Sequence, residues 1–305
     1  MGHVATSSDP NWPPASSLIS PRSVPGRSNV GLVGVATHAT SLSARSALST
    51  PQALRRALGR FSTWSFSDHV DLGEHLALVD YGDVDNPDGK GGPRRVREVV
   101  ASFDPDLEMV VVLGGDNAAT WHALRAMSAQ NYDDWGLVTL DAHLDMREGV
   151  SNGSPVRQLL DDGLDARHVV QVGIGDFSNS PHYARRALEL GVSVIALEEL
   201  RSTGVEETAR RAIEVASEGG RRVYVDIDLD VADRSVVPGC PAAVPGGLSA
   251  SELRRFVRGV TSERSVVAID LTEIDVARDS ADERTVRLAA LLVLEALAGV
   301  RRRGT

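Results

Sequence analysis

Short apolar runs alternate with longer, more polar segments along most of the chain. We interpret the apolar runs as buried strands and the segments between several of them as helices. The runs comprise residues 30–35, 76–81, 109–113, 135–140, 169–174, 192–197, 223–229 and 266–271. Strands that alternate with helices in this way predict βαβ units around a parallel sheet, which is the α/β class of fold.

The first part of the chain does not follow this pattern. Residues 1–27 are rich in Pro and Ser and have no periodicity, so we expect them to form a flexible arm outside the core. Residues 28–305 contain no internal repeat and no obvious linker. We therefore expect them to fold as one domain.

Composition narrows the classes of protein. The chain has 305 residues, 42% hydrophobic and 24% charged, which is enough for a large core. A formal net charge of -10 without a long basic block argues against a nucleic-acid partner. No apolar stretch reaches transmembrane length, and the first thirty residues lack a signal-peptide pattern, so no membrane partner is expected. The single cysteine, Cys240, excludes an intrachain disulfide and fits a cytoplasmic location.

Candidate metal ligands follow the apolar run 135–140. Asp141, His143 and Asp145 alternate along an extended chain, so their side chains point the same way. Ligand sites of open α/β sheets lie at this end of the strands. An isolated Asp-x-His pair would more simply be a strand end with a hydrogen-bonded histidine. The third residue and a second acidic strand end favour a metal site instead.

That second strand end contains Asp226, Asp228, Asp230 and Asp233, and two further strands end at residues 116–117 and at Glu273. Burying so many carboxylates together is costly unless cations neutralise them. Carboxylates with one imidazole suit six-coordinate ions such as Mn²⁺ better than tetrahedral zinc. A pair of such ions generates hydroxide at neutral pH, which indicates hydrolysis.

Four motifs occur in the order and spacing of a known family. They are Gly114-Gly115-Asp116, Asp141-Ala-His143-x-Asp145, Asp228-x-Asp230-x-x-Asp233 and the late Glu273. Across about residues 29–300 the chain resembles the ureohydrolases, which include arginase, agmatinase and formimidoylglutamase. The resemblance implies a three-layer α/β/α fold with an eight-stranded parallel sheet, two Mn²⁺ ions per chain, trimers or hexamers, and hydrolysis of a C–N bond in an amidine or guanidine.

The resemblance also implies which residues bind metal. Asp141 and Asp228 would bridge both ions, and His143 and Asp230 would complete one site. The full implied set of ligands is Asn117, Asp141, His143, Asp145, Asp228 and Asp230.

Two residues would perform catalysis according to the same resemblance. Asp145 would pass a proton to the leaving amine, and Glu273 would accept N–H groups of the substrate cation in a charge-assisted contact. Asp226 stands where many family members have a small hydroxyl residue, so both a structural role and ligation remain open. The role of His38, after the first strand, is open as well.

Two positions depart from the family pattern. Asn117 replaces a histidine ligand, which puts the first metal site in doubt because an amide oxygen is the weaker ligand. The loop 151–155 lacks the histidine of arginases and agmatinases and is similar to the Ser-rich loop of formimidoylglutamases. We therefore predict hydrolysis of N-formimidoyl-L-glutamate to L-glutamate and formamide, a step of histidine degradation.

The predicted substrate has two carboxylates that need cationic partners. Arg147 and Arg157 flank the loop and could supply them through bidentate contacts, although both could equally be exposed surface residues. Asn152 and Ser154 within the loop complete the expected substrate-binding set. One alternative is a hydrolase that releases urea from a guanidino acid or agmatine. An alternative of another class is a metal-deficient, non-catalytic partner subunit.

Overall fold

The centre of the molecule is a parallel sheet of nine strands. The computed structural model describes residues 9, 11–43 and 49–303. The sheet has the order β1-β5-β2-β6-β11-β10-β7-β8-β9. Its strands are β1 (Ile19–Ser20), β2 (Ser28–Val35), β5 (Leu76–Asp83), β6 (Met109–Gly114), β7 (Trp135–Leu140), β8 (Val169–Ile174), β9 (Ser193–Ala196), β10 (Arg222–Asp228) and β11 (Val266–Thr272). A separate antiparallel pair consists of β3 (Trp64–Ser65) and β4 (Val70–Asp71).

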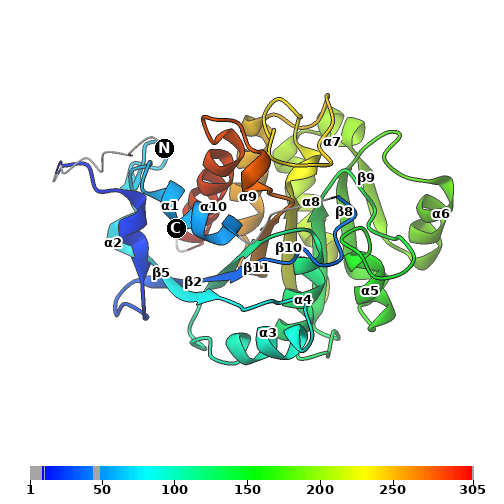
Figure 1. Ribbon diagram of the computed structural model, residues 1–305, viewed down its shortest axis with the longest axis horizontal. Coiled ribbons are helices and arrows are strands. Elements are labelled where there is room, and N and C mark those ends of the chain that lie inside the picture. Colours follow the sequence, from blue (N-terminus) through cyan, green and yellow to red (C-terminus); the bar gives the residue numbers. More distant parts are fainter. Residues whose placement is uncertain (1–8, 10, 44–48, 304–305) are drawn as a thin grey trace.

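Helices cover both faces of the sheet, as Figure 1 shows. One layer packs through α1, α7, α8, α9 and α10, and the other through α3, α4, α5 and α6. The α-helices are α1 (Thr50–Leu58), α2 (Leu72–His75), α3 (Gly92–Val100), α4 (Ala118–Met127), α5 (Pro155–Asp161), α6 (Pro181–Leu190), α7 (Leu197–Thr203), α8 (Val205–Ala216), α9 (Ala250–Thr261) and α10 (Arg284–Arg302). The predicted three-layer α/β/α architecture is confirmed, with nine strands instead of eight.

The additional strand belongs to the segment that we expected to be a flexible arm. Within residues 11–27, Ala15 is completely buried, and the backbone N–H of Ala15 donates to the carbonyl oxygen of Phe61 at 2.7 Å. Ile19 pairs with Leu78 of β5, which adds β1 to the sheet edge. For these residues the expectation was wrong, because a two-residue strand is too short to produce a periodic pattern. Residues 1–8 and 10 lie outside the described part of the chain.

The central strands bring together segments that are far apart in sequence. β6, β11, β10 and β7 are consecutive neighbours, and all are parallel. β6 and β7 are buried along their whole length, as expected for a parallel sheet with helices on both faces. Because parallel strands end at the same edge, the residues that follow these four strands meet there. This edge contains the candidate site.

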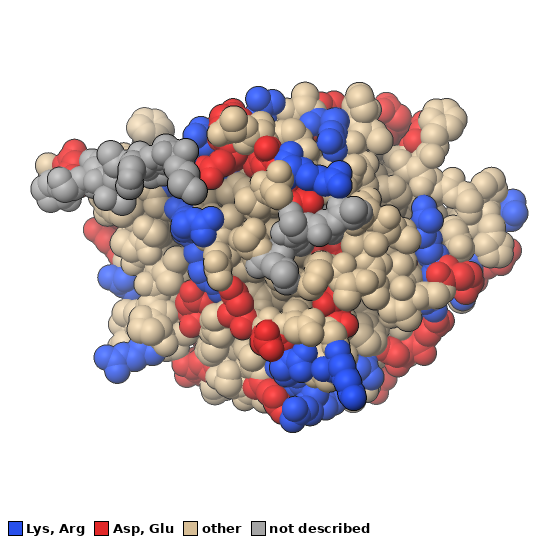
Figure 2. Space-filling view, viewed as in Figure 1, with Lys and Arg blue, Asp and Glu red and all other residues tan. Residues whose placement is uncertain are grey.

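Charged side chains of both signs are interspersed over the face of the molecule seen in Figure 2. Across the described chain, several charged side chains pair along helices, for example Arg94 with Glu98 and Arg210 with Glu207. Exposed pairs of this kind contribute little to stability. Within the described residues, no helix is long and apolar enough to span a membrane.

Candidate metal centre

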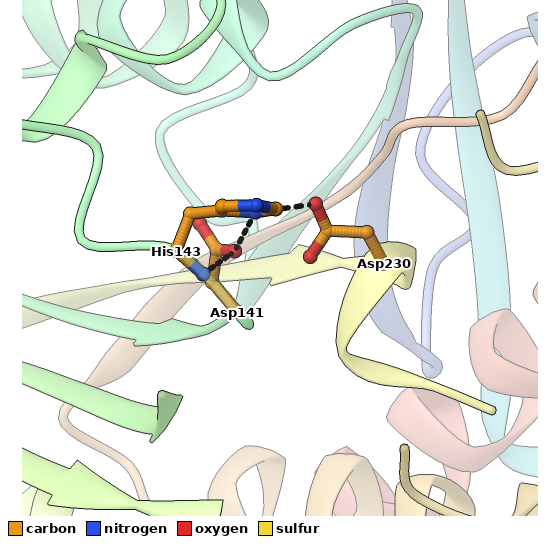
Figure 3. Close-up of side chains that lie close together, drawn as sticks. All are labelled: Asp141, His143 and Asp230. Carbon is orange, nitrogen blue, oxygen red and sulfur yellow. Dashed lines mark hydrogen bonds and ion pairs between the residues drawn. The ribbon is translucent and has the colours of Figure 1, made fainter. Parts of the chain in front are cut away.

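Three ligand-type side chains converge where β7 and β10 end. His143 Nδ1 lies 2.8 Å from Asp230 Oδ2 and 3.6 Å from Asp141 Oδ1. In Figure 3 the imidazole points toward the Asp230 carboxylate and lies beside that of Asp141. One ligand atom of each residue lies within 4.8 Å of the others. The sequence prediction that these strand ends meet is therefore correct for this trio.

The same local turn builds both halves of the group. Asp141 Oδ1 accepts a hydrogen bond from the backbone N–H of His143 at 2.6 Å. Asp228 Oδ1 accepts one from the backbone N–H of Asp230 at 2.8 Å. A short carboxylate that bonds to the backbone two residues later turns the chain at the end of a strand. Each Asp-x-His or Asp-x-Asp sequence thus directs two side chains into one region.

Burial and mutual repulsion dominate the electrostatics of the group. Burial first, and then neighbouring carboxylates, raise the pKa values of Asp141 and Asp228 well above the usual range. Burial alone would lower the pKa of His143, but the hydrogen bond and charge of Asp230 raise it to about 9. Burial would raise the pKa of Asp230, yet His143 holds it below its ordinary value. The ion pair therefore neutralises only part of the buried charge.

The donor set fits a divalent cation. Asp141 is completely buried, and its Oδ2 has no hydrogen-bond partner among the described residues. A buried oxygen without a hydrogen-bond partner costs free energy, and so does repulsion between neighbouring buried carboxylates. A bound cation would reduce both costs. Carboxylate oxygens with one imidazole nitrogen match hard, six-coordinate ions of the Mn²⁺ type.

Two further carboxylates lie in the same region on unusual backbone. Asp145 and Glu273 have φ angles of 50° and 62°, in the left-handed region that residues other than glycine rarely adopt. Such conformations cost about 1–3 kcal/mol each and cluster at functional sites. Burial, as the largest cause, raises the pKa of Asp145 to about 7. The two residues predicted to act in catalysis are thus among the eight described residues other than glycine that have a positive φ.

Asn117 contacts both of these residues. Its Nδ2 donates to Asp145 Oδ2 at 2.6 Å, and its backbone N–H donates to Glu273 Oε1 at 3.0 Å. Its amide oxygen lies 2.9 Å from the hydroxyl of Thr120 and 3.0 Å from that of Thr272. This differs from the expected metal ligation, because the amide presents N–H to the site while its oxygen contacts two hydroxyls.

A cleft of about 370 Å³ opens onto the metal group. Its walls include His143, Asp145, Asp228, Asp230 and Glu273, together with Leu42, Ser43, Leu144, Met146, Arg147, Asn152, Gly153, Ser178, Asn179, Ser180, Tyr183 and Ala242. Arg147 is the one Lys or Arg among these lining residues. Within the described chain, no residue forms a hydrogen bond or ion pair with its guanidinium. The unpaired guanidinium of Arg147 therefore faces a cleft whose other charged lining residues are mainly acidic.

The family model that describes arginases matches residues 28–299. The chain belongs to the arginase family. It is 31% identical over 290 residues to formimidoylglutamase of Bacillus subtilis, with 88% of this chain and 86% of that protein covered. The crystal structure of formimidoylglutamase from that species has a TM-score of 0.88 at 29% identity and covers 99% of this chain and 96% of its own.

Two other arginase-family relatives extend the comparison. Formiminoglutamase of Trypanosoma cruzi, solved with Mn²⁺, has a TM-score of 0.84 and covers 96% of this chain and 99% of its own; at 24% identity it supports the fold alone. Agmatinase of Halalkalibacterium halodurans is 30% identical over 236 residues and covers 74% of this chain and 76% of its own.

The structure places two residues of the expected substrate-binding set away from the cleft walls. Arg157 donates from Nε to the carbonyl oxygen of Arg147 at 2.7 Å and pairs with Asp161. Ser154 is completely buried, and its hydroxyl donates to the carbonyl oxygen of Ser151 at 2.9 Å. Both side chains form contacts within or next to the loop around the cleft. These contacts do not agree with the direct substrate contact that we expected for Arg157 and Ser154.

Asn152, by contrast, lines the cleft as expected, and its amide is engaged at both ends. Nδ2 donates to Glu273 Oε1 at 2.9 Å, and Oδ1 accepts from the backbone N–H of Leu42 at 2.9 Å. Asn152 thus connects the backbone of Leu42 in the cleft wall to Glu273. His38, left open by the sequence, does not line the cleft; its Nδ1 lies 3.9 Å from Asp88 Oδ1.

Sequence reasoning missed Asp270. This aspartate on β11 is completely buried and lies in register with Asp226 of β10. Burial first, and then Asp270, raise the pKa of Asp226 well above its usual value. Asp226 thus lies in a buried pair of carboxylates, which by itself decides neither of the two roles that the sequence left open. The signal for Asp270 was present, because a carboxylate inside the apolar run 266–271 needs buried partners.

Proposed function

We propose that the protein hydrolyses N-formimidoyl-L-glutamate to L-glutamate and formamide. The observation that carries this proposal is the unpaired guanidinium of Arg147 in the cleft that opens onto His143 and the buried carboxylates. A substrate with a cationic amidine and distant carboxylates complements both features. Similarity to formimidoylglutamase of Bacillus subtilis over 88% of the chain supports the same choice.

The metal would be held by Asp141, His143, Asp145, Asp228 and Asp230. We propose two Mn²⁺ ions per chain, and the orientation of Asn117 leaves the ligand count of one of them below that usual in the family. When bound, such ions lower the pKa of water and so supply a nucleophile at neutral pH.

Glu273 would orient the reacting group. Its carboxylate accepts N–H groups of the planar amidinium in a charge-assisted contact, which fixes the amidine carbon in the cleft. Two donors, the backbone N–H of Asn117 and Nδ2 of Asn152, hold Glu273 Oε1 in place and so fix the orientation of the carboxylate.

Asp145 would move the proton. Water adds to the amidine carbon, and the bond from this carbon to the glutamate nitrogen breaks. The leaving nitrogen must gain a proton as it departs, and Asp145, next to the metal group, is placed to deliver the one released by the attacking water. The carbon then retains its other nitrogen and leaves as formamide.

Arg147 would select the substrate. A guanidinium binds carboxylates through two parallel hydrogen bonds, and this one has no competing partner among the described residues. Agmatine carries no carboxylate and would leave this cation unpaired. A guanidino acid would satisfy it and remains the nearest alternative substrate, with urea as its product.

We retain two expectations that rest on sequence and resemblance. The cytoplasm is the proposed location, because the single cysteine, Cys240, is free and buried. A homo-oligomer, either trimer or hexamer, is the proposed assembly. Fractionation of the native host and sedimentation of the purified protein would test these points.

A substrate panel with Mn²⁺-loaded protein tests the function. Formimidoyl-glutamate, guanidino acids and agmatine would be supplied separately, and formamide, urea and ammonia would be measured. We expect formamide from formimidoyl-glutamate and no urea from agmatine. Urea from a guanidine with formimidoyl-glutamate untouched would replace the substrate assignment. No turnover of any compound, with no bound metal, would favour the non-catalytic partner subunit.

A further inference from the structure

A buried hydroxyl lies between the metal centre and Asp270. Thr120 Oγ1, on the first turn of α4, is 2.9 Å from Asn117 Oδ1 and 2.9 Å from Asp270 Oδ2. Asp270 also accepts hydrogen bonds from the Tyr224 hydroxyl at 2.8 Å and from the backbone N–H of Ile227 at 3.3 Å. Thr120, Asp270 and Tyr224 are completely buried. Asp270 is therefore fixed by its own partners and can anchor the hydroxyl above it.

This layer determines which way the Asn117 amide faces. The amide oxygen accepts from hydroxyls, whereas the amide nitrogen can only donate. The Thr272 hydroxyl donates to the oxygen at 3.0 Å, and the single hydrogen of Thr120 Oγ1 is shared between this oxygen and Asp270 Oδ2, both at 2.9 Å. Nδ2 is therefore directed to Asp145 Oδ2 at 2.6 Å. If the amide were reversed, its oxygen would face the Asp145 carboxylate, and both acceptors would lack a donor. Such a reversal is unfavourable in a buried site.

We propose that Thr120 and Asp270 are positioning residues that act through Asn117 to orient Asp145. The series runs from the anchored Asp270 through the Thr120 hydroxyl and the Asn117 amide to the carboxylate on strained backbone. None of these contacts requires Thr120 or Asp270 to touch the substrate or a metal ion. The inference rests on the proposed function for its kinetic consequence, but the orientation of Asp145 also affects metal binding, which is measured without substrate.

Thr120→Val tests the series, because valine keeps the shape of threonine and removes the hydroxyl. Thr261→Val is the matched control: it is the same substitution at another completely buried threonine, on α9, whose hydroxyl donates to the carbonyl oxygen of Val257 at 2.8 Å, outside the contacts between Asp270 and Asn117. Thr120→Ser keeps the hydroxyl and serves as the conservative rescue. The unfolding temperatures of the three variants, measured without metal, show how much stability is lost whenever a buried hydroxyl is removed.

Mn²⁺ titration and steady-state kinetics then provide the decisive readouts. When a metal-binding side chain loses a hydrogen-bond partner that does not itself bind the metal, metal affinity or activity typically falls about 10- to 100-fold. We expect Thr120→Val to lose that much in the affinity for one ion and in kcat, with KM little changed. Thr261→Val and Thr120→Ser should stay within about threefold of the wild type. If Thr120→Val fails to fold, Thr120→Ala is measured in its place.

The opposite result would be equal losses in Thr120→Val and Thr261→Val, or a Thr120→Val protein with unchanged kcat and Mn²⁺ affinity. Either outcome would reduce Thr120 to a structural residue and overturn the proposal. Failure of the proposed function gives a different result: the wild type itself would not hydrolyse the amidine. In that case the Mn²⁺ titration would still separate Thr120→Val from Thr120→Ser.

Discussion

Asn152 Nδ2 donates to Oε1 of Glu273 at 2.9 Å, which ties the loop 151–155 to the carboxylate that follows β11. The other end of the same amide accepts from the backbone N–H of Leu42, so the cleft wall and Glu273 are held by one side chain. Glu273 lies on left-handed backbone with a φ of 62°. The asparagine therefore holds a carboxylate on strained backbone in one orientation, and we propose that the substrate cation binds to this carboxylate.

Asn152→Asp should impair the reaction strongly. The substitution keeps the shape but replaces the donor with a second carboxylate beside Glu273. Loss of a hydrogen bond to a charged group costs about 1.5–3 kcal/mol, which corresponds to roughly 10- to 100-fold in kcat/KM. Asn131→Asp on the surface is the control, because its side chain only accepts from the backbone N–H of Asp133. Unchanged kcat/KM in Asn152→Asp would show that Asn152 does not position Glu273.

Arg147→Met should raise KM for formimidoyl-glutamate about 100-fold and change kcat little. The reason is that, in the proposed complex, the unpaired guanidinium binds the distant carboxylate of the substrate and does not contact the reacting carbon. Exposed Arg185→Met on α6 controls for the loss of one positive charge, and its KM should match the wild type. A KM for Arg147→Met equal to that of the control would remove Arg147 from the substrate site.

Removal of metal should destabilise the fold. A cation that neutralises the buried carboxylates stabilises the folded state by about 4 kcal/mol at a thousandfold excess over Kd. For a chain of 305 residues the melting temperature should fall by roughly 6 °C after chelation. Calorimetry with and without chelator measures the shift, and Mn²⁺ should restore it. An equal melting temperature in both states would mean that Asp141 and its neighbours bind no ion.

His122 should make stability depend on acid pH. Burial lowers the pKa of this histidine from 6.5 to about 4, with a smaller opposing effect of Asp88 and a smaller lowering effect of Arg125. The folded state therefore binds fewer protons than the unfolded state between these values, and stability is lost as pH falls through this window. From pH 7.5 to pH 5 the loss from this group is about 2 kcal/mol.

The comparison with His122→Gln isolates this contribution, because metal release at acid pH affects both proteins. Denaturant unfolding at the two pH values gives the difference in free energy of unfolding. The variant should lose about 2 kcal/mol less than the wild type. Parallel curves for the two proteins would show that His122 is accessible to protons in the folded state.

The positions of the metal group were predictable because alternation along a strand and the parallel sheet together determine them. Asp141, His143 and Asp230 lie at the ends of long apolar runs, and those strands are neighbours in the sheet. The capping box at Ser249 and Glu252 could also be predicted, because it depends only on residues three apart. Local patterns and strand order suffice for such features.

Side-chain directions were not predictable in the same way. Arg147 and Arg157 flank the same loop, yet one faces the cleft and the other binds backbone carbonyl oxygens. The Asn117 amide faces Asp145 because Thr272, 155 positions away, contacts its oxygen. Contacts between distant segments decide these orientations, and no pattern in a single sequence records them.

The central claim is that water attacks the amidine carbon and that the glutamate nitrogen leaves. Hydrolysis of formimidoyl-glutamate by Mn²⁺-loaded protein in ¹⁸O-labelled water tests it directly, with mass spectrometry of all products. We predict equal amounts of unlabelled glutamate and of formamide that carries one ¹⁸O atom. Ammonia with the label in N-formylglutamate would show that the other C–N bond breaks, and an intact substrate beside a metal-loaded protein would contradict the assignment altogether.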